Sequence, residues 1–296
     1  MATVFYDKAA VSVQWGDIGE TLLASDFTVN LSSSAQPLYA IGNKGSLGQF
    51  PSSARVGDVS FNFITSLTGV HWGQKGNIIN FLASGIKHSV GSLASGVTIS
   101  GAGVKGVGFL NSYSFNVASN SISSSSASFT FFGHDNELPV SGRLADSTAI
   151  VGVGTTAGSA LATGVVHGRY TPLTTLRTTI GAGADPDPTD NGTVFGADYS
   201  VSFNHNPIYQ LGQEFPVTSL YTTAQESINV TEDVFNSGLA FDETASDYTI
   251  DLHGLDNAST NDKMQLAMIS GKQVSTSMSA GLDDIVRSQK TLTASY

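Results

Sequence analysis

The sequence predicts an all-β protein with one or two short helices, built as two tandem domains of β-sandwich or partial-barrel type. Short segments alternate polar and apolar residues, Gly- and Ser-rich turns separate them, and blocks of the first half recur in the second. The 296 residues suffice for two domains that each bury a core. The chain has no cysteine, which excludes disulfides and thiolate metal sites.

Strands are expected along most of the first half. The segment 76–85 is the exception, because Ile78, Ile79, Leu82 and Ala83 have helical spacing. We expect one short helix per domain, the second shorter or absent. The serine run 121–126 predicts a turn. The strands are expected at 11–15, 27–31, 58–64, 96–100 and 107–117.

The two halves share four blocks in the same order, which indicates a duplicated domain. We place the first domain at 1–142 and the second at 143–296, with 143–164 as linker and entry strand. The second domain opens with residues 165–180, and 147–168 is interpreted as a strand and loop region that joins the domains. The matching blocks are 26–31 with 198–203, 37–42 with 207–212, 60–63 with 227–230, and the closing strand pair 109–117 and 127–132 with 268–274 and 290–296.

The most specific shared block is Pro-x-Tyr-x-x-Gly. Proline fixes φ as the chain leaves a strand, tyrosine anchors the corner, and glycine supplies a turn conformation. We interpret both copies as structural corners rather than ligand sites. Their residues are Pro37, Tyr39, Gly42, Pro207, Tyr209 and Gly212.

Charge is sparse and unevenly distributed. Charged residues make up 12% of the chain and the net charge is −11, of which residues 1–150 contribute −1 (7 basic, 8 acidic) and residues 151–296 contribute −10 (6 basic, 16 acidic). This balance argues against a nucleic-acid clamp. It is compatible with a surface past which nucleic acid slides, and equally with an acidic face that serves solubility.

Three sequence features were weighed for catalytic or binding chemistry. Residues 101–106 have Gly-x-Gly-x-x-Gly spacing, but a strand rather than a helix is expected to follow, so we predict no nucleotide site. His134, with Asp135 and Glu137 beside it, is the nearest approach to a catalytic cluster, yet the chain has no Gly-x-Ser-x-Gly. His205 is interpreted as a turn residue. We predict no enzyme activity and no cofactor.

Asp185, Asp187 and Asp190 lie in one Gly-, Pro- and Asp-rich loop. Their carboxylates suit calcium, although the spacing does not fit an EF-hand, and an unliganded acidic turn remains the alternative. The amino terminus lacks the apolar run of a secretory signal, so synthesis in a cytoplasm is expected. The longest uncharged stretch, 147–168, is interrupted by Gly, Thr and Ser, so a membrane span is not expected.

Both Pro-x-Tyr-x-x-Gly blocks follow a strand and a polar turn, and precede a Phe-Pro pair and another strand. This arrangement resembles the front of the major tail, or tail-tube, proteins of tailed bacteriophages. The closing pattern of apolar strand, small-residue turn and alternating strand is also similar to theirs. The resemblance covers much of both halves.

The resemblance implies a β-sandwich or partly closed barrel with a flanking helix, assembled into stacked rings whose inner strands line a channel for the genome. A tandem duplication implies a trimeric ring with pseudo-sixfold symmetry, located in the virion tail after assembly in the host cytoplasm. The implied partners are further copies, other tail proteins and DNA in transient passage, without membrane insertion. The loop with Asp185, Asp187 and Asp190 is expected to bridge rings.

A second hypothesis is a receptor- or glycan-binding tail-tip, baseplate or decoration protein. Trp15, Trp72 and Tyr221 are the aromatic residues considered for a stacking surface, although a core role is the simpler reading for Trp72.

Overall fold

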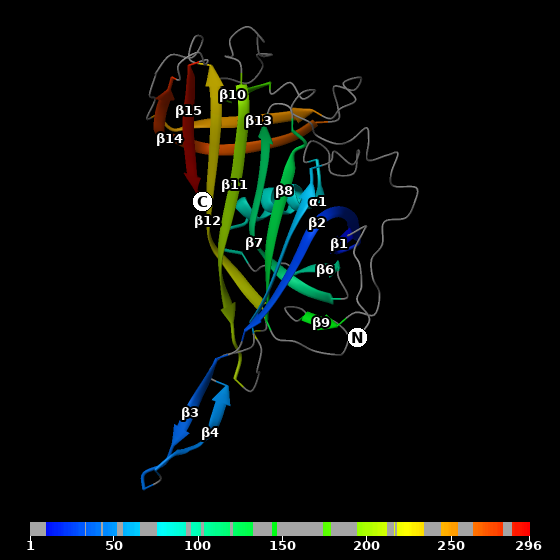
Figure 1. Ribbon diagram of the computed structural model, residues 1–296, viewed down its shortest axis with the longest axis vertical. Coiled ribbons are helices and arrows are strands. Elements are labelled where there is room, and N and C mark those ends of the chain that lie inside the picture. Colours follow the sequence, from blue (N-terminus) through cyan, green and yellow to red (C-terminus); the bar gives the residue numbers. More distant parts are fainter. Residues whose placement is uncertain are drawn as a thin grey trace.

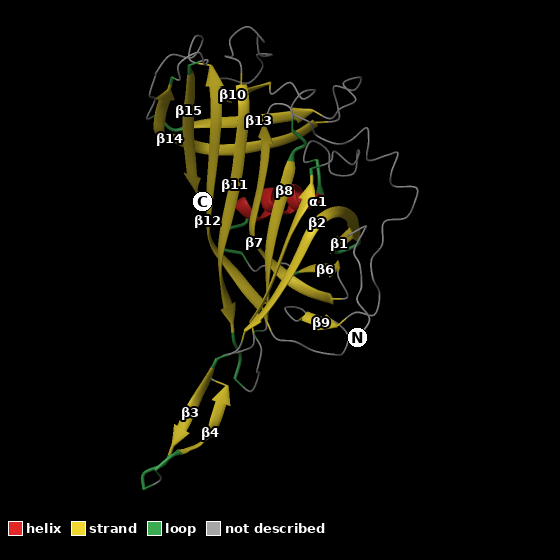
Figure 2. Ribbon diagram, in the orientation of Figure 1, coloured by secondary structure: helices red, strands yellow, loops and turns green. Residues whose placement is uncertain are grey.

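The computed structural model contains 15 strands and one helix in the part of the chain that it describes (Figures 1 and 2). The all-β prediction is confirmed. The described residues are 10–32, 34–42, 44–51, 56–65, 76–92, 96–101, 104–118, 121–132, 144–146, 174–178, 194–211, 216, 218–233, 244–253, 263–280 and 286–296.

The first half forms a closed six-stranded antiparallel barrel. Its strands follow one another in the order β7, β6, β1, β2, β5 and β8, and β8 pairs back onto β7. Alternation explains the closure, because in β5 every second residue from Gly57 to Phe63 is buried and the residues between them are exposed. The strands are β1 (Ala10–Trp15), β2 (Ile18–Ser32), β5 (Val56–Ile64), β6 (Val97–Gly101), β7 (Val104–Ala118) and β8 (Ser124–Phe132).

The second half repeats this strand order. Its strands follow the path β14, β15, β12 and β11, as β7, β8, β5 and β2 do in the first half, and β13 and β10 stand where β6 and β1 stand. The strands are β10 (Thr174–Thr178), β11 (Val194–Ile208), β12 (Thr218–Asp233), β13 (Ser246–His253), β14 (Lys263–Ser279) and β15 (Arg287–Ser295).

The registers of the two halves also agree. Asp26 lies opposite Asn62 in the β2–β5 pair, and Asp198 lies opposite Asn229 in the β11–β12 pair. The blocks 26–31 with 198–203 and 60–63 with 227–230 therefore occupy equivalent places in the two halves. The Pro-x-Tyr-x-x-Gly blocks do not, because Pro37 lies in the separate β3–β4 sheet and Pro207 pairs with Ser219 of β12. One difference is that β1 pairs with β2, whereas no β10–β11 pairing occurs among the described residues.

The two halves are joined by strand pairing. β11 pairs with β7 from Gly196 opposite Ala118 to Ser202 opposite Ser112. β7 can pair with four strands because it is long: β6 and the short β9 (Leu144–Asp146) pair with its first residues, and β8 and β11 with the later ones. Residues 144–146, which the sequence placed in the linker of the second domain, therefore lie against the first-half barrel.

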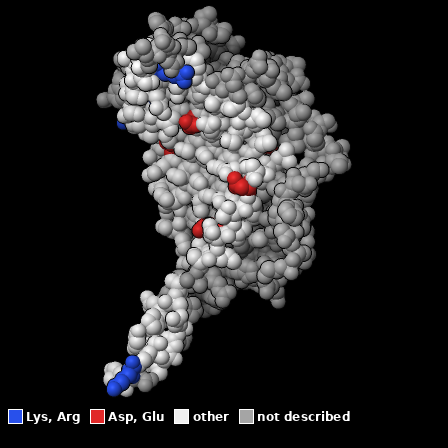
Figure 3. Space-filling view, in the orientation of Figure 1, with Lys and Arg blue, Asp and Glu red and all other residues white. Residues whose placement is uncertain are grey.

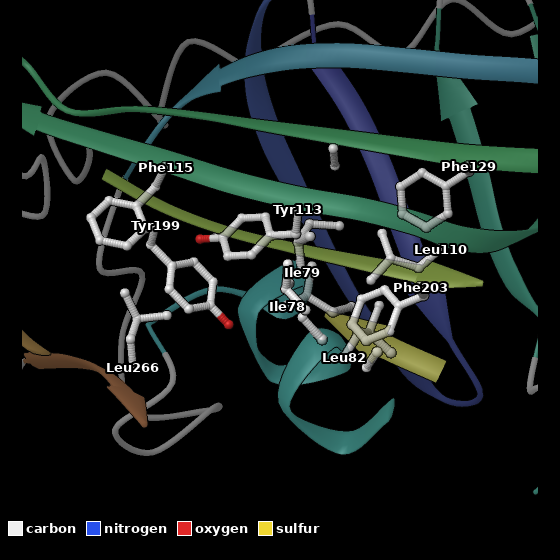
Figure 4. Close-up of a cluster of buried hydrophobic side chains, with 14 of the residues drawn as sticks. Ile78, Ile79, Leu82, Leu110, Tyr113, Phe115, Phe129, Tyr199, Phe203 and Leu266 are labelled. Carbon is white, nitrogen blue, oxygen red and sulfur yellow. The ribbon is translucent and has the colours of Figure 1, made fainter. Parts of the chain in front are cut away.

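The helix α1 (Ile78–Lys87) confirms the helical spacing seen in the sequence. Asn77 caps it, accepting a hydrogen bond from the Asn80 backbone N–H at 2.9 Å. Its apolar side chains Ile78, Ile79 and Leu82 are buried beside Tyr113 of β7 and Phe203 of β11, so α1 covers the inner face where the halves meet (Figure 4). It is the only helix among the described residues. A second-half counterpart, which the sequence predicted to be shorter or absent, would fall at 234–243, outside the described residues.

A hairpin of β3 (Ala35–Tyr39) and β4 (Ser46–Pro51) projects from the end of β2, away from the barrel (Figure 1). It contains the first Pro-x-Tyr-x-x-Gly block. Gly42 has φ +94°, the left-handed conformation that glycine adopts readily.

The serine run does not form only a turn, because β8 begins within it at Ser124. Serine at alternate positions can face solvent while its neighbours face the core, and Ser125 is 2% exposed.

Candidate functional site

One face of the sheet is built almost entirely from hydroxyl and amide side chains. It runs over eight strands in the order β2, β5, β8, β7, β11, β12, β15 and β14, and so crosses from one half to the other. Directly opposed residues form polar rows along it. One row is Asp26, Asn62, Ser126, Ser114, Ser200, Ser227, Thr293 and Lys272, and the next is Thr28, Ser60, Ser128, Ser112, Ser202, Gln225 and Ser295.

Many of these side chains hydrogen-bond to one another across the strands. Ser112 pairs with Ser128 at 2.8 Å and Ser114 with Ser126 at 2.7 Å. Because a hydroxyl engaged by its neighbour is less available to a ligand, this polar face is suited to weak contacts. Figure 3 shows a described surface that is mostly uncharged, with a few acidic side chains on the body and basic ones near the top of the body and at the hairpin tip.

The opposite face is apolar and forms the core. Phe27, Phe61 and Tyr113 lie in one row of opposed residues that continues through Val201 to Glu226. Tyr113 is fully buried, and this burial raises the pKa of its hydroxyl to about 12. Because the rest of this row is hydrophobic, the buried carboxylate of Glu226 requires a positively charged or hydrogen-bonding partner.

That partner is Lys87 at the end of α1. Its Nζ lies 2.6 Å from Glu226 Oε1 and donates to the carbonyl of Ala267 at 2.7 Å. Tyr296 donates its hydroxyl to Glu226 Oε2 at 2.7 Å, and the Lys87 Nζ is 3.5 Å from the Tyr199 hydroxyl. Burial, with Glu226 nearby, raises the pKa of both tyrosines. We call Lys87, Glu226, Tyr199 and Tyr296 the Lys87 cluster; it ties the first-half helix to the second-half sheet.

A second polar link between the halves runs through His205. Its Nε2 lies 2.7 Å from Asn111 Oδ1, while Asn111 Nδ2 donates to Thr130 Oγ1 at 2.5 Å and Thr130 donates to Asp58 Oδ1 at 2.8 Å. Because the ionised carboxylate only accepts, these directions place the proton of neutral His205 on Nε2. His205 Nδ1, 3.0 Å from Ser219 Oγ, then accepts from that hydroxyl. Burial lowers the pKa of His205.

His205 is thus a residue of strand β11 that bonds to β7 beside the seam, the β7–β11 pairing that joins the two halves. The prediction of a turn histidine is wrong. The sequence did not single out Lys87, Glu226 or Asn111 either. An isolated Glu within an alternating apolar strand was the one available signal for Glu226, since such a position normally faces the core.

Two strand edges are equivalent to the edges that form the seam, but they pair with no strand in the described part of the chain. β2 pairs with β5 along 26–32 and β14 pairs with β15 along 275–279, and no described strand pairs with the other edge of either segment. These edges correspond to those that β11 and β7 use to pair with each other. We call them the β2 edge and the β14 edge.

The predicted corner residues lie at or near strand ends. Pro37 and Tyr39 are in β3, Pro207 is in β11, and Gly212 lies outside the described residues. Tyr39 is 70% exposed and Tyr209 is 52% exposed, so neither anchors its corner through burial. The apolar residues two positions further along the chain, Ile41 and Leu211, are also exposed.

Several other candidates fall outside the described residues, namely Asp185, Asp187, Asp190, His134, Asp135, Glu137 and Trp72. Of the aromatic residues considered for glycan stacking, Tyr221 is 2% exposed and so presents no open ring face, while Trp15 is partly buried and packs on Phe81 with ring centroids 5.7 Å apart. The residues that the structure describes contain no group of three or more His, Cys, Asp or Glu side chains suited to a metal.

The ten-residue α1 is too short to cross a bilayer, and it is the one helix that could be considered in the described segments. Compared with protein-family models and with curated proteins, the sequence matches none of them.

Proposed function

We propose that this protein is a virion structural protein that polymerises into stacked rings of a bacteriophage tail tube, through which the genome passes. The observation that carries the proposal is the seam between β7 and β11. It is a head-to-tail junction between two equivalent units, and it leaves an equivalent pair of edges at the two ends of the eight-strand polar face.

Exposed strand edges favour pairing with another chain. In this proposal the β14 edge of one copy pairs with the β2 edge of the next, in the register of the internal seam. Transferring that register places Asp26 opposite Ser277, Phe27 opposite Thr276 and Thr28 opposite Ser275, by analogy with Asp198–Asn116, Tyr199–Phe115 and Ser200–Ser114. A rotation that closes after three chains gives a trimeric ring with six equivalent units.

The chemistry of the polar face supports a channel surface. Its side chains are short, mostly uncharged and bonded to one another, and the few charges within its two rows include Asp26 and Lys272. A polyanion passing such a face meets few cations that could neutralise phosphates, so strong binding is not expected. Proposed partners are further copies, other tail proteins and transiently passing DNA. The proposed location is the virion tail.

The absence of natural cysteine allows a direct test of the inter-chain register. In the Thr28→Cys/Ser275→Cys variant, a short thiol cross-linker should join neighbouring chains into covalent oligomers that end at the ring size. Negative-stain microscopy of the same sample should reveal rings or tubes with a central hole. Monomers across a range of salt and protein concentrations, with no inter-chain cross-link, would overturn the proposal.

The internal seam supplies the matched control. Ser114 and Ser200 lie opposite each other within one chain, at the places equivalent to Ser275 and Thr28. The Ser114→Cys/Ser200→Cys variant should therefore lose both free thiols by cross-linking within each chain, while its mass on a denaturing gel stays that of a single chain. Success of this control with failure of Thr28→Cys/Ser275→Cys would locate the failure in the inter-chain contact rather than in the reagent.

A further inference from the structure

The Lys87 cluster has no polar counterpart in the first half. Equivalence through the strand registers places Val59 at the position of Glu226, Phe27 at that of Tyr199, and Phe131 at that of Tyr296. Three polar groups of the cluster are thus matched by three apolar ones. The sequence between β12 and β13, where a second-half counterpart of α1 would lie, contains no Lys or Arg.

The cluster can therefore form only where a first half and a second half are joined, with α1 of the first half packed on the sheet of the second half. The side chains of Lys87 and Glu226 are 4% and 0% exposed, so solvent does not replace the missing partner when one of them is alone. A buried ion pair of this kind can set which surfaces pair, at no gain in overall stability.

We propose that the Lys87–Glu226 pair makes the halves alternate during assembly. The inference rests on the proposed function, since it concerns the same edges. If β7 of one chain paired with the β2 edge of another, joining two first halves, Lys87 would face Val59 and Phe27 in place of Glu226 and Tyr199. If the β14 edge paired with β11 of another chain, joining two second halves, Glu226 would lack Lys87. Both errors bury a charge without its counter-charge, whereas the alternating arrangement does not.

This selection acts while chains are folding, because in the finished protein β7 and β11 already pair within the chain. A first half synthesised before its second half presents both a β2 edge and a β7 edge to other chains. Lys87 then disfavours the joining of first halves until Glu226 arrives.

The test uses cysteine pairs that report each junction. Ser114→Cys/Thr28→Cys reports the joining of two first halves and Ser200→Cys/Ser275→Cys that of two second halves, while Thr28→Cys/Ser275→Cys reports the alternating inter-chain contact. Within one chain, β5 and β8 separate β2 from β7, so the first reporter forms cross-links between chains. Each reporter is placed in the native background and in Lys87→Met/Glu226→Val, unfolded in urea, refolded at several protein concentrations and cross-linked.

In the native background we expect the alternating reporter to cross-link and the two error reporters to remain uncross-linked. In Lys87→Met/Glu226→Val, error cross-links should rise by about tenfold or more, increasingly at high protein concentration, because no unpaired charge opposes them. Error cross-links of equal yield in both backgrounds, or absent from a refolded Lys87→Met/Glu226→Val protein, would overturn the inference. Absence of alternating cross-links in both backgrounds would instead reject the proposed assembly.

Should Lys87→Met/Glu226→Val fail to refold, Tyr199→Phe and Tyr296→Phe are added. The resulting Val, Phe and Phe are the residues that the first-half barrel already packs at these positions, in Val59, Phe27 and Phe131. The same cross-link yields then decide the question. The more conservative Glu226→Gln, which removes the charge and keeps a carbonyl acceptor for Lys87, should give a smaller rise in the same direction.

Discussion

Asn116 donates its side-chain amide to Asp198 across the seam of the two halves, and the two residues lie directly opposite each other in the β7–β11 ladder. In the first half the equivalent Asp26 accepts from the backbone N–H of Asn62 at 3.1 Å and from its Nδ2 at 2.6 Å. The other side of Asp26 is the β2 edge, where the proposed neighbouring chain would place the Ser277 hydroxyl. A hydrogen-bond donor would then face an aspartate both in the internal β7–β11 pair and in the proposed contact between chains.

Asp198→Ala and Asp26→Ala should therefore have different consequences. Asp198→Ala removes a seam contact within the chain and should lower the free energy of unfolding by about 1 kcal/mol, since both partners are exposed. Asp26→Ala should also weaken the inter-chain contact and raise the protein concentration needed for assembly. Urea unfolding and sedimentation velocity measure the two effects. Equal effects of both substitutions on assembly would contradict the assigned register.

Single and double substitutions in the Lys87 cluster should be strongly non-additive. Glu226→Val leaves a buried ammonium and should cost about 3–5 kcal/mol of unfolding free energy, and Lys87→Met leaves a buried carboxylate at similar cost. Lys87→Met/Glu226→Val removes both charges and should cost much less than the sum of the two, because apolar groups then pack on an apolar face. Urea denaturation of the four proteins gives the coupling energy. An additive result would mean that the two charges do not interact.

Stability should fall on mild acidification through His205. Its folded-state pKa is lowered from 6.5, chiefly by burial, with Asp58 opposing the shift. The unfolded chain therefore takes up a proton at higher pH than the folded protein does. The stabilising contribution is complete above about pH 6.5 and is lost as the pH falls toward the folded-state pKa.

The charged and titratable groups that face His205 are Asp58, through Thr130 and Asn111, and the Tyr221 ring, whose centroid is 5.9 Å away. His205→Gln should keep a donor to Asn111 and flatten the fall in melting temperature between about pH 7.5 and 5.5. An unaltered slope in His205→Gln would exclude this residue as its source.

The sequence supported the fold better than the site. Helical spacing located α1, and alternation and the repeated blocks located the strands β1, β5, β7, β11 and β12, because burial of one face imposes a period on local sequence. The partners of Glu226 and His205 were beyond reach, because Lys87 is 139 residues from Glu226 and Asn111 is 94 from His205. Such contacts depend on how two halves join, which no local pattern encodes. The prediction that Tyr39 and Tyr209 anchor their corners was not met for a related reason. The sequence identified the strand ends correctly, but whether a side chain is buried there depends on the neighbouring parts of the fold.

Two glycines allow a final test of how tightly the barrel is packed. A Cβ at Gly108 of β7 would lie 2.7 Å from Cζ of Phe131, whose ring is fully buried in the first-half core. Gly108→Ala should therefore lower the free energy of unfolding by about 1–3 kcal/mol through overpacking. Gly85 lies on the exposed side of α1 and a Cβ there would meet nothing within 4 Å.

Gly85→Ala should accordingly raise the free energy of unfolding by up to about 1 kcal/mol, because alanine favours the helix over glycine. The two substitutions add the same methyl group, so urea unfolding measured side by side separates packing from backbone preference. Equal stability of both variants would mean that Phe131 can move aside, and that β7 and β8 are less closely packed than their pairing indicates.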